Sequence, residues 1–209
     1  MDIDEERLER WRQGDDAAGH ALVERHYDAV ERFFVNKARD RATDLIQRTF
    51  LMLLESRSRI REGANFRAYL FGIARNVLYE YYRQYRRDGA RFDPGTRSIA
   101  DMGQSPTSLI AREQETQLLL HALRRIPIEY QLILELYYWE SMRGREIATV
   151  LGVPEGTART RIRRAKQLLE EQLAVLASTP AMLKSTVSNL DGWAQRLRGQ
   201  IHAGEAKAR

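Results

Sequence analysis

The sequence predicts an all-α protein with two small helical domains joined by a flexible linker, the second domain containing a helix-turn-helix. Apolar residues return every three or four positions through most of the chain, which is the period of an amphipathic helix. Strand-like alternation is almost absent. Between residues 88 and 108 glycine and proline interrupt the chain and the period is lost. We therefore expect domains at 1–87 and 109–177, a linker at 88–108 and a C-terminal extension at 178–209.

The amino-acid composition limits which classes of protein this chain can belong to. Lys and Arg number 34 against 29 Asp and Glu. Because this excess of positive charge is modest, the places where basic residues cluster indicate binding partners better than the net charge does. Cysteine is absent, which excludes disulfides and cysteine-bound metal and suits a reducing compartment. The acidic N-terminus lacks the apolar core of a signal peptide, and no apolar run reaches the roughly 20 residues that span a membrane. We expect a cytoplasmic protein without membrane insertion.

Four helices are expected in the first domain. They are placed at residues 3–12, 17–39 and 41–58 and after Asn65, with Asp15 and Asn65 suited to cap the second and fourth. We interpret His20 and His26 as surface groups, since neither has a convincing metal-ligand partner.

The third helix has two contrasting faces. Its buried stripe is expected to be Leu45, Ile46, Phe50, Leu53 and Leu54. Its other side carries Asp44, Gln47, Arg48 and Glu55, with Leu51 and Met52 beside them. A solvated face is one interpretation. The apolar band is wider than one helix contact requires, which favours a partner surface.

Tyrosine and arginine gather on the fourth helix. Its core stripe is expected to be Phe66, Leu70, Ile73 and Val77. The other side carries Arg75, Asn76, Tyr79, Tyr82, Arg83 and Arg86 at spacings of three or four. Rings among arginines suit single-stranded or distorted nucleic acid, because bases stack on rings and phosphates attract charge. The alternative is that the tyrosines cover a core edge and the arginines are solvated.

The second domain is expected to hold a helix at 109–125, a helix opening at Pro127, and a helix-turn-helix. Ile147, Ala148 and Leu151 give a short helix its apolar face, and Gly152 suits a left-handed helix end. Pro154 suits the start of the next helix, which should run to about Leu176. Its inner face is expected to be Ala158, Ile162, Ala165 and Leu169.

The outer face of this last helix is basic. It carries Thr157, Arg159, Thr160, Arg161, Arg163, Arg164 and Lys166. The second helix of a helix-turn-helix lies in the DNA major groove, where arginine contacts guanine and further charges hold phosphates. The alternative is a solvated face on an ordinary helix hairpin. We find no phosphate-binding glycine loop and no nucleophile–base pair, so the sequence predicts no enzyme activity, cofactor or metal site.

Several segments together resemble one protein family. Residues 44–50 (DLIQRTF) are similar to the polymerase-binding helix of bacterial RNA polymerase sigma factors, and residues 69–76 (YLFGIARN) to their promoter-melting segment. Residues 123–127 (LRRIP) and 146–152 (EIATVLG) resemble the fourth conserved region. The chain, over about residues 7–175, resembles the extracytoplasmic-function (ECF) group of the sigma-70 family. Arg48 stands where that family often has an acidic residue, and Tyr69 where tryptophan is common.

The resemblance implies three binding surfaces. Core polymerase would be bound through Asp44, Gln47, Arg48 and Leu51. The −10 promoter element would be melted by Asn65, Arg75, Asn76, Tyr79, Tyr82, Arg83 and Arg86. The −35 element would be read by Glu155, Thr157, Arg159, Thr160, Arg163 and Arg164. The implied partners are core RNA polymerase, promoter DNA and an anti-sigma factor, with no ATP required.

Two other classes stay open at this point. One is an ordinary helix-turn-helix regulator, which would usually dimerise on a palindrome. The other is a helical adaptor that binds RNA or a protein partner. The extension carries Met182, Leu183, Val187, Leu190, Trp193 and Leu197 at loosely helical spacing. It predicts a short amphipathic helix that orders only against another surface, regulatory or stabilising, with a disordered end as the alternative.

Overall fold

The computed structural model describes residues 3–61, 63–85, 93–100 and 114–177, together with residues 184 and 186. The chain divides into two compact units. The first comprises Met1–Arg91 and takes in Ala148–Pro154, and the second comprises Phe92–Ile147 and Glu155–Arg209. In the described ranges the elements are helices, and the extended backbone is limited to an isolated bridge between Ser98 and Pro127. The predicted all-α fold is confirmed.

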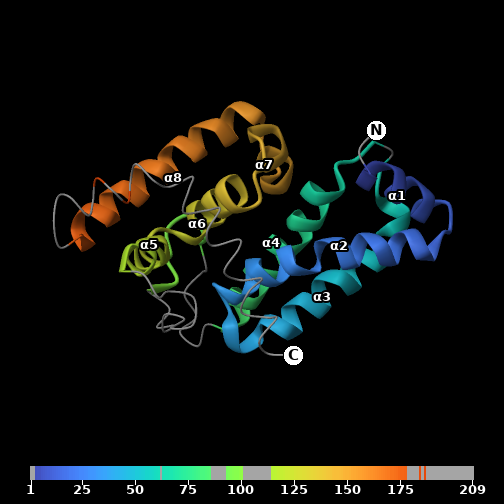
Figure 1. Ribbon diagram of the computed structural model, residues 1–209, viewed down its shortest axis with the longest axis horizontal. Coiled ribbons are helices and arrows are strands. Elements are labelled where there is room, and N and C mark those ends of the chain that lie inside the picture. The colour runs from blue at the N-terminus through green and yellow to red at the C-terminus, as the bar shows by residue number, and fades with distance from the viewer. Residues whose placement is uncertain are drawn as a thin grey trace. The chain divides into compact units, whose positions relative to one another are not determined.

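The first unit is a four-helix arrangement that closely follows the predicted helices. It contains α1 (Ile3–Arg12), α2 (Asp16–Val35), α3 (Ala42–Glu55) and α4 (Phe66–Tyr85), with short 3₁₀ turns at Arg39–Arg41 and Arg57–Arg59. Helix α4 packs against both α2 and α3, and α1 packs mainly along α2 (Figure 1). The core stripe predicted on α4 is confirmed, because Phe66, Leu70, Ile73 and Val77 are all buried.

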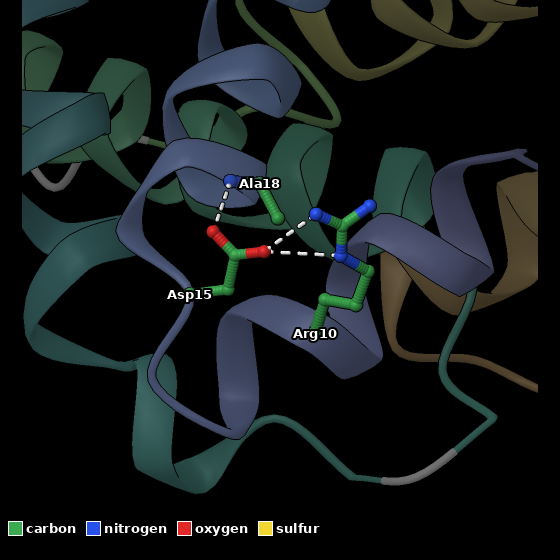
Figure 2. A network of polar contacts seen from close by, with 3 residues as sticks. All are labelled: Arg10, Asp15 and Ala18. Carbon is green, nitrogen blue, oxygen red and sulfur yellow. Dashed lines mark hydrogen bonds and ion pairs between the residues drawn. The ribbon is translucent and has the colours of Figure 1, made fainter.

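The turn between α1 and α2 is fixed by one carboxylate. Gly14 has φ +107°, a conformation that glycine adopts cheaply. The Oδ1 atom of Asp15 then accepts a hydrogen bond from the backbone N–H of Ala18 at 3.1 Å, and its Oδ2 atom accepts two from Arg10 (Figure 2). These bonds, the Ala18 amide first, lower the pKa of the Asp15 carboxyl. The predicted cap is confirmed.

Helix α1 is locked onto α2 by an aromatic ring and a buried polar pair. The ring of Trp11 is 2% exposed and lies so close to Gly19 that any Cβ there would overlap it. The His26 ring, on α2, is buried and its Nε2 lies 2.7 Å from a carboxylate oxygen of Asp4. The interpretation of His26 as a surface group is therefore wrong, whereas His20 is exposed as expected.

The second unit is built around one long helix. It contains α5 (Gln114–Arg125), α6 (Ile128–Leu134), the π-helix η4 (Glu135–Trp139) and α8 (Glu155–Leu176), and α7 (Gly144–Leu151) begins in it. Helix α8 packs against α5 and α6 (Figure 1), and it ends at Leu176, as predicted for this helix. The π-helix was not predicted. Residues 109–113, where a helix was expected to begin, lie outside the described residues.

Part of the predicted linker is held by the second unit. The backbone N–H groups of Ile128 and Glu129 donate to the carbonyls of Arg97 and Pro94 at 2.8 and 2.9 Å. Ile99 is fully buried. Residues 93–100, which we name the strap, therefore cover the start of α6. The rest of the predicted linker lies outside the described residues.

The extension is described at two positions only. Lys184 and Thr186 are helical, and Thr186 is 4% exposed. The amphipathic helix predicted for 178–209 otherwise lies outside the described residues and stays a prediction. None of the helices described is both long and apolar enough to cross a bilayer.

Candidate nucleic-acid interface

The predicted turn between α7 and α8 has the expected backbone. Gly152 has φ +69°, and its N–H donates to the carbonyl of Thr149 while the N–H of Val153 donates to Ala148. This pattern ends a helix in a left-handed residue. Ile147 is fully buried, and a Cβ on Gly144 would lie 3.6 Å from the Cγ of Arg159. The start of α7 therefore lies beside the first turns of α8.

The two faces of α8 differ sharply. The predicted inner residues are buried: Ala158, Ile162, Ala165 and Leu169, followed by Leu173. The residues predicted to read DNA are exposed: Glu155, Thr157, Arg159, Thr160, Arg163 and Arg164. Among these, Arg159 pairs with Glu155 and Arg164 with Glu171, both at exposed positions where water competes with the pair. Arg163 is exposed, and none of the ion pairs found among the described residues involves it.

Two basic residues expected on this outer face lie elsewhere. Arg161 is half-buried and forms an ion pair with Glu129 of α6. Lys166 is also half-buried, with its Nζ 4.3 Å from the ring centre of Tyr137 and 5.1 Å from that of Tyr138. Both therefore join α8 to the α6–η4 segment, and their predicted place on the exposed face is wrong. A cation over aromatic rings is attracted by their electron-rich faces.

The surface of α4 presents a smaller polar group than the sequence predicted. Asn76 and Arg83 are exposed, while Arg75 and Tyr79 are half-buried. The Arg75 guanidinium donates to the Asn76 side-chain carbonyl at 3.0 Å and lies 5.8 Å from the Tyr79 ring centre. Asn65 is exposed, and its Oδ1 caps α4 by accepting from Ala68 at 2.8 Å, as predicted. Arg86 lies outside the described residues.

Tyr82 does not belong to this surface. Its side chain is fully buried, and its hydroxyl donates to the backbone carbonyl of Lys37 at 2.6 Å. Lys37 is itself buried, with Nζ donating to the carbonyl of Phe33 at 2.6 Å. The prediction that Tyr82 faces outward is wrong, because α4 packs against α1, α2 and α3 and so buries a wider arc than one stripe.

The outer face of α3 is exposed as predicted and is more apolar than expected. Asp44, Gln47, Arg48 and Leu51 are exposed. Leu54, which was expected in the core, is 53% exposed, and Tyr27 of α2 is 41% exposed while stacking on Phe50 with ring centres 6.0 Å apart. We name Tyr27, Leu51 and Leu54 the outer apolar patch. The apolar period of the second helix placed Tyr27 on its core-facing side, which is wrong, because its exposure depends on how α2 meets α3.

A further ion pair joins the α3 face to α4. The Arg48 guanidinium lies 2.9 Å from a carboxylate oxygen of Glu80 and is 48% exposed. Arg48 therefore keeps enough open surface for a second partner. The described residues include no group of three or more His, Cys, Asp or Glu placed to hold a metal ion.

Comparison with known proteins identifies this pair of units. Residues 22–88 match the family model for sigma-70 region 2, and residues 116–169 match that for sigma-70 region 4. The RNA polymerase sigma factor CarQ of Myxococcus xanthus is 32% identical over 174 residues, which are 81% of this chain and 97% of CarQ. The chain belongs to the sigma-70 family. Its relatives place it in the ECF group of RNA polymerase sigma factors.

Two further comparisons define the extent of the likeness. A probable RNA polymerase sigma factor, RfaY of Xanthomonas campestris pv. campestris, is 27% identical over 133 residues, but the match spans only 33% of that protein. The solved complex of the sigma factor RpoE with the anti-sigma factor NepR from Bartonella quintana superposes with a TM-score of 0.57 at 23% identity. It covers 75% of this chain and 96% of the other, and it shows a shared fold.

As an ECF sigma factor, this protein binds core RNA polymerase and promoter DNA and directs promoter-specific initiation of transcription. Its family consists of regulatory initiation factors. Membership of this family replaces the two alternatives that the sequence left open, a palindrome-binding regulator and a helical adaptor.

Proposed function

We propose that the two units divide the work of promoter recognition, with α8 reading the −35 element as duplex. The observation that carries this proposal is the outer face of α8, where Arg159, Arg163 and Arg164 are exposed above a buried inner stripe. A helix of this kind enters the major groove with its N-terminal turns nearest the bases. Arg163 is the best candidate for a bidentate contact with guanine, since no carboxylate competes for it among the described residues.

The first unit is proposed to hold core polymerase and to open the −10 element. The exposed residues Asp44, Gln47, Arg48 and Leu51 of α3 would dock on the clamp helices of the largest polymerase subunit. The outer apolar patch adds area that would be desolvated on docking. Asn65, Arg75, Asn76, Tyr79 and Arg83 would hold an unstacked base and its phosphates, and Arg86 is proposed with them. Capture of the base offsets the few kcal/mol spent on unpairing it.

We also infer the setting in which this sigma factor works. Polymerase supplies the chemistry, so the sigma factor would act without catalysis of its own, in the cytoplasm, where polymerase works. RpoE of Bartonella quintana was solved with an anti-sigma factor. Its likeness in fold supports an anti-sigma factor as a partner of this protein too.

Run-off transcription with purified core polymerase tests the proposal. The full chain should give specific transcripts from genomic fragments of its host, and core alone should not. Replacing the −35 sequence of such a promoter should reduce the transcript, and permanganate should detect unpaired thymines near −10. Specific initiation that is indifferent to the −35 sequence would contradict the role of α8, and the absence of any specific transcript would contradict both roles.

A further inference from the structure

We propose that Glu129 and Arg161 form a joint that sets the orientation of the recognition helix α8, so that both are positioning residues for −35 recognition. This inference rests on the proposed function of α8. Arg161 lies in the second turn of α8, between Arg159 and Arg163 in sequence, yet it turns away from their exposed face. Its guanidinium forms an ion pair with the carboxylate of Glu129, and their side chains are only 33% and 18% exposed.

The position of Glu129 is fixed from its other side by the strap. Its backbone N–H donates to the carbonyl of Pro94 at 2.9 Å, and the neighbouring N–H of Ile128 donates to Arg97 at 2.8 Å. A Cβ on Gly95 would lie 3.5 Å from the Glu129 carboxylate. The carboxylate of Glu129 therefore lies between the turn of the strap and the guanidinium of Arg161.

The strap has internal contacts of its own. The Oδ1 atom of Asp93 accepts a hydrogen bond from the N–H of Gly95 at 2.9 Å, which closes a tight turn. Ile99 is fully buried, and Ser98 bridges to Pro127. The strap thus anchors the backbone of Glu129, and the ion pair links Arg161 and its turn of α8 to this anchor.

Such a joint matters because base contacts tolerate little displacement. A bidentate arginine–guanine contact needs both hydrogen bonds within normal distance and angle. The joint is placed in the turn of α8 that carries Arg159 and Arg163, so a tilt of α8 would move both from the base edges. A charged pair that is partly shielded from water also costs more to break than one on the open surface.

A charge-exchange cycle tests the joint in the holoenzyme. The full chain is assembled with core polymerase as wild type, Glu129→Arg, Arg161→Glu and the double exchange. The measured quantity is the ratio of transcription from a promoter with an intact −35 element to transcription from the same promoter with that element replaced. We expect each single exchange to lower this ratio about tenfold, and the double exchange to recover most of it.

Two controls separate a positioning role from other effects. Glu170→Gln removes a carboxylate from an exposed position of α8 outside the joint, so the ratio should stay at the wild-type value. Transcription from a template that is already unpaired at −10 and lacks the −35 element should be unchanged in every variant. That result shows that the variants fold and bind core polymerase.

The outcomes are distinct for the joint and for the proposed function. If the double exchange fails to recover the ratio, the joint is refuted. If Glu129→Arg leaves the ratio at the wild-type value, Glu129 has no positioning role. A wild-type protein that shows no −35 dependence would instead refute the proposed role of α8.

Discussion

At the scale of single residues, the buried His26 makes stability depend on pH. Burial lowers the pKa of His26 below its usual value near 6.5, and the adjacent Asp4 carboxylate opposes this shift without cancelling it. Arg67 and Arg25 lower the pKa further. The folded chain thus favours neutral His26, so the unfolded chain binds more protons once the pH falls below about 6.5.

We therefore expect the melting temperature of the first unit to be highest above about pH 6.5 and to fall as the pH drops through that value. Thermal unfolding of the full chain across this range measures the effect. His26→Gln should flatten the dependence, whereas His20→Gln, at an exposed position on the same helix, should preserve it. An unchanged slope in His26→Gln would show that other groups cause the dependence.

Tyr82 and Arg83 are neighbours with opposite expected roles. Tyr82→Phe removes the hydrogen bond to the buried Lys37 carbonyl, so it should lower the free energy of unfolding by about 1–3 kcal/mol and leave promoter opening intact. Arg83→Ala, at an exposed position, should leave stability within about 0.5 kcal/mol and reduce open-complex formation. Denaturant unfolding and permanganate footprinting measure the two properties. If Tyr82→Phe instead reduces promoter opening and leaves stability unchanged, Tyr82 belongs to the surface that contacts the −10 element.

Ser141 stores backbone strain at the end of the π-helix. Its φ of +52° lies in the left-handed region, where a residue with a Cβ is disfavoured by roughly 1 kcal/mol. Ser141→Gly should therefore stabilise the second unit by about that amount, measured by denaturant unfolding. Ser58→Gly, at an exposed position without positive φ, should not stabilise the chain. Destabilisation by Ser141→Gly would mean that the serine side chain contributes more than the strain costs.

At the scale of elements, α1 depends on one small residue. This helix precedes the part of the chain that matches sigma-70 region 2. Its Trp11 ring nevertheless packs directly against Gly19 of α2, where a Cβ on residue 19 would have no room. Gly19→Ala should therefore displace the indole and loosen α1, costing about 1–3 kcal/mol. Tryptophan fluorescence and thermal unfolding report both changes. Ala17→Gly, at an exposed position in the first turn of α2, measures how much an exchange between alanine and glycine changes stability through helix propensity alone.

The helices were predictable because their signals are local. Asp15, Asn65 and Gly152 mark helix ends through contacts within three or four residues, and all three behave as predicted. Side-chain placement on helix borders was less predictable. Tyr82 is buried and Leu54 exposed because the arc that each helix buries depends on how many neighbours it meets. The inward turn of Arg161 depends on Glu129, which lies 32 residues earlier.

At the scale of the whole molecule, each unit carries a surface suited to a different partner. The outer face of α3 combines polar residues with the outer apolar patch, which suits a protein partner. The outer face of α8 is dominated by arginine, which suits DNA. The two functions should therefore be separable by mutation in the intact chain.

Leu51→Glu and Arg163→Ala form the pair that tests this separation. Leu51 is 55% exposed on α3, so a buried glutamate at that position should weaken assembly with core polymerase on every promoter alike. Arg163→Ala should leave assembly unchanged and cost roughly 1–3 kcal/mol at one position of the −35 element. Binding to core polymerase is measured by fluorescence anisotropy, and −35 discrimination by run-off transcription on promoters changed one base pair at a time. If Arg163→Ala instead weakens transcription uniformly on all promoters, Arg163 contacts a phosphate. If Leu51→Glu alters discrimination between −35 sequences without altering assembly with core polymerase, the proposed division between the two units is wrong.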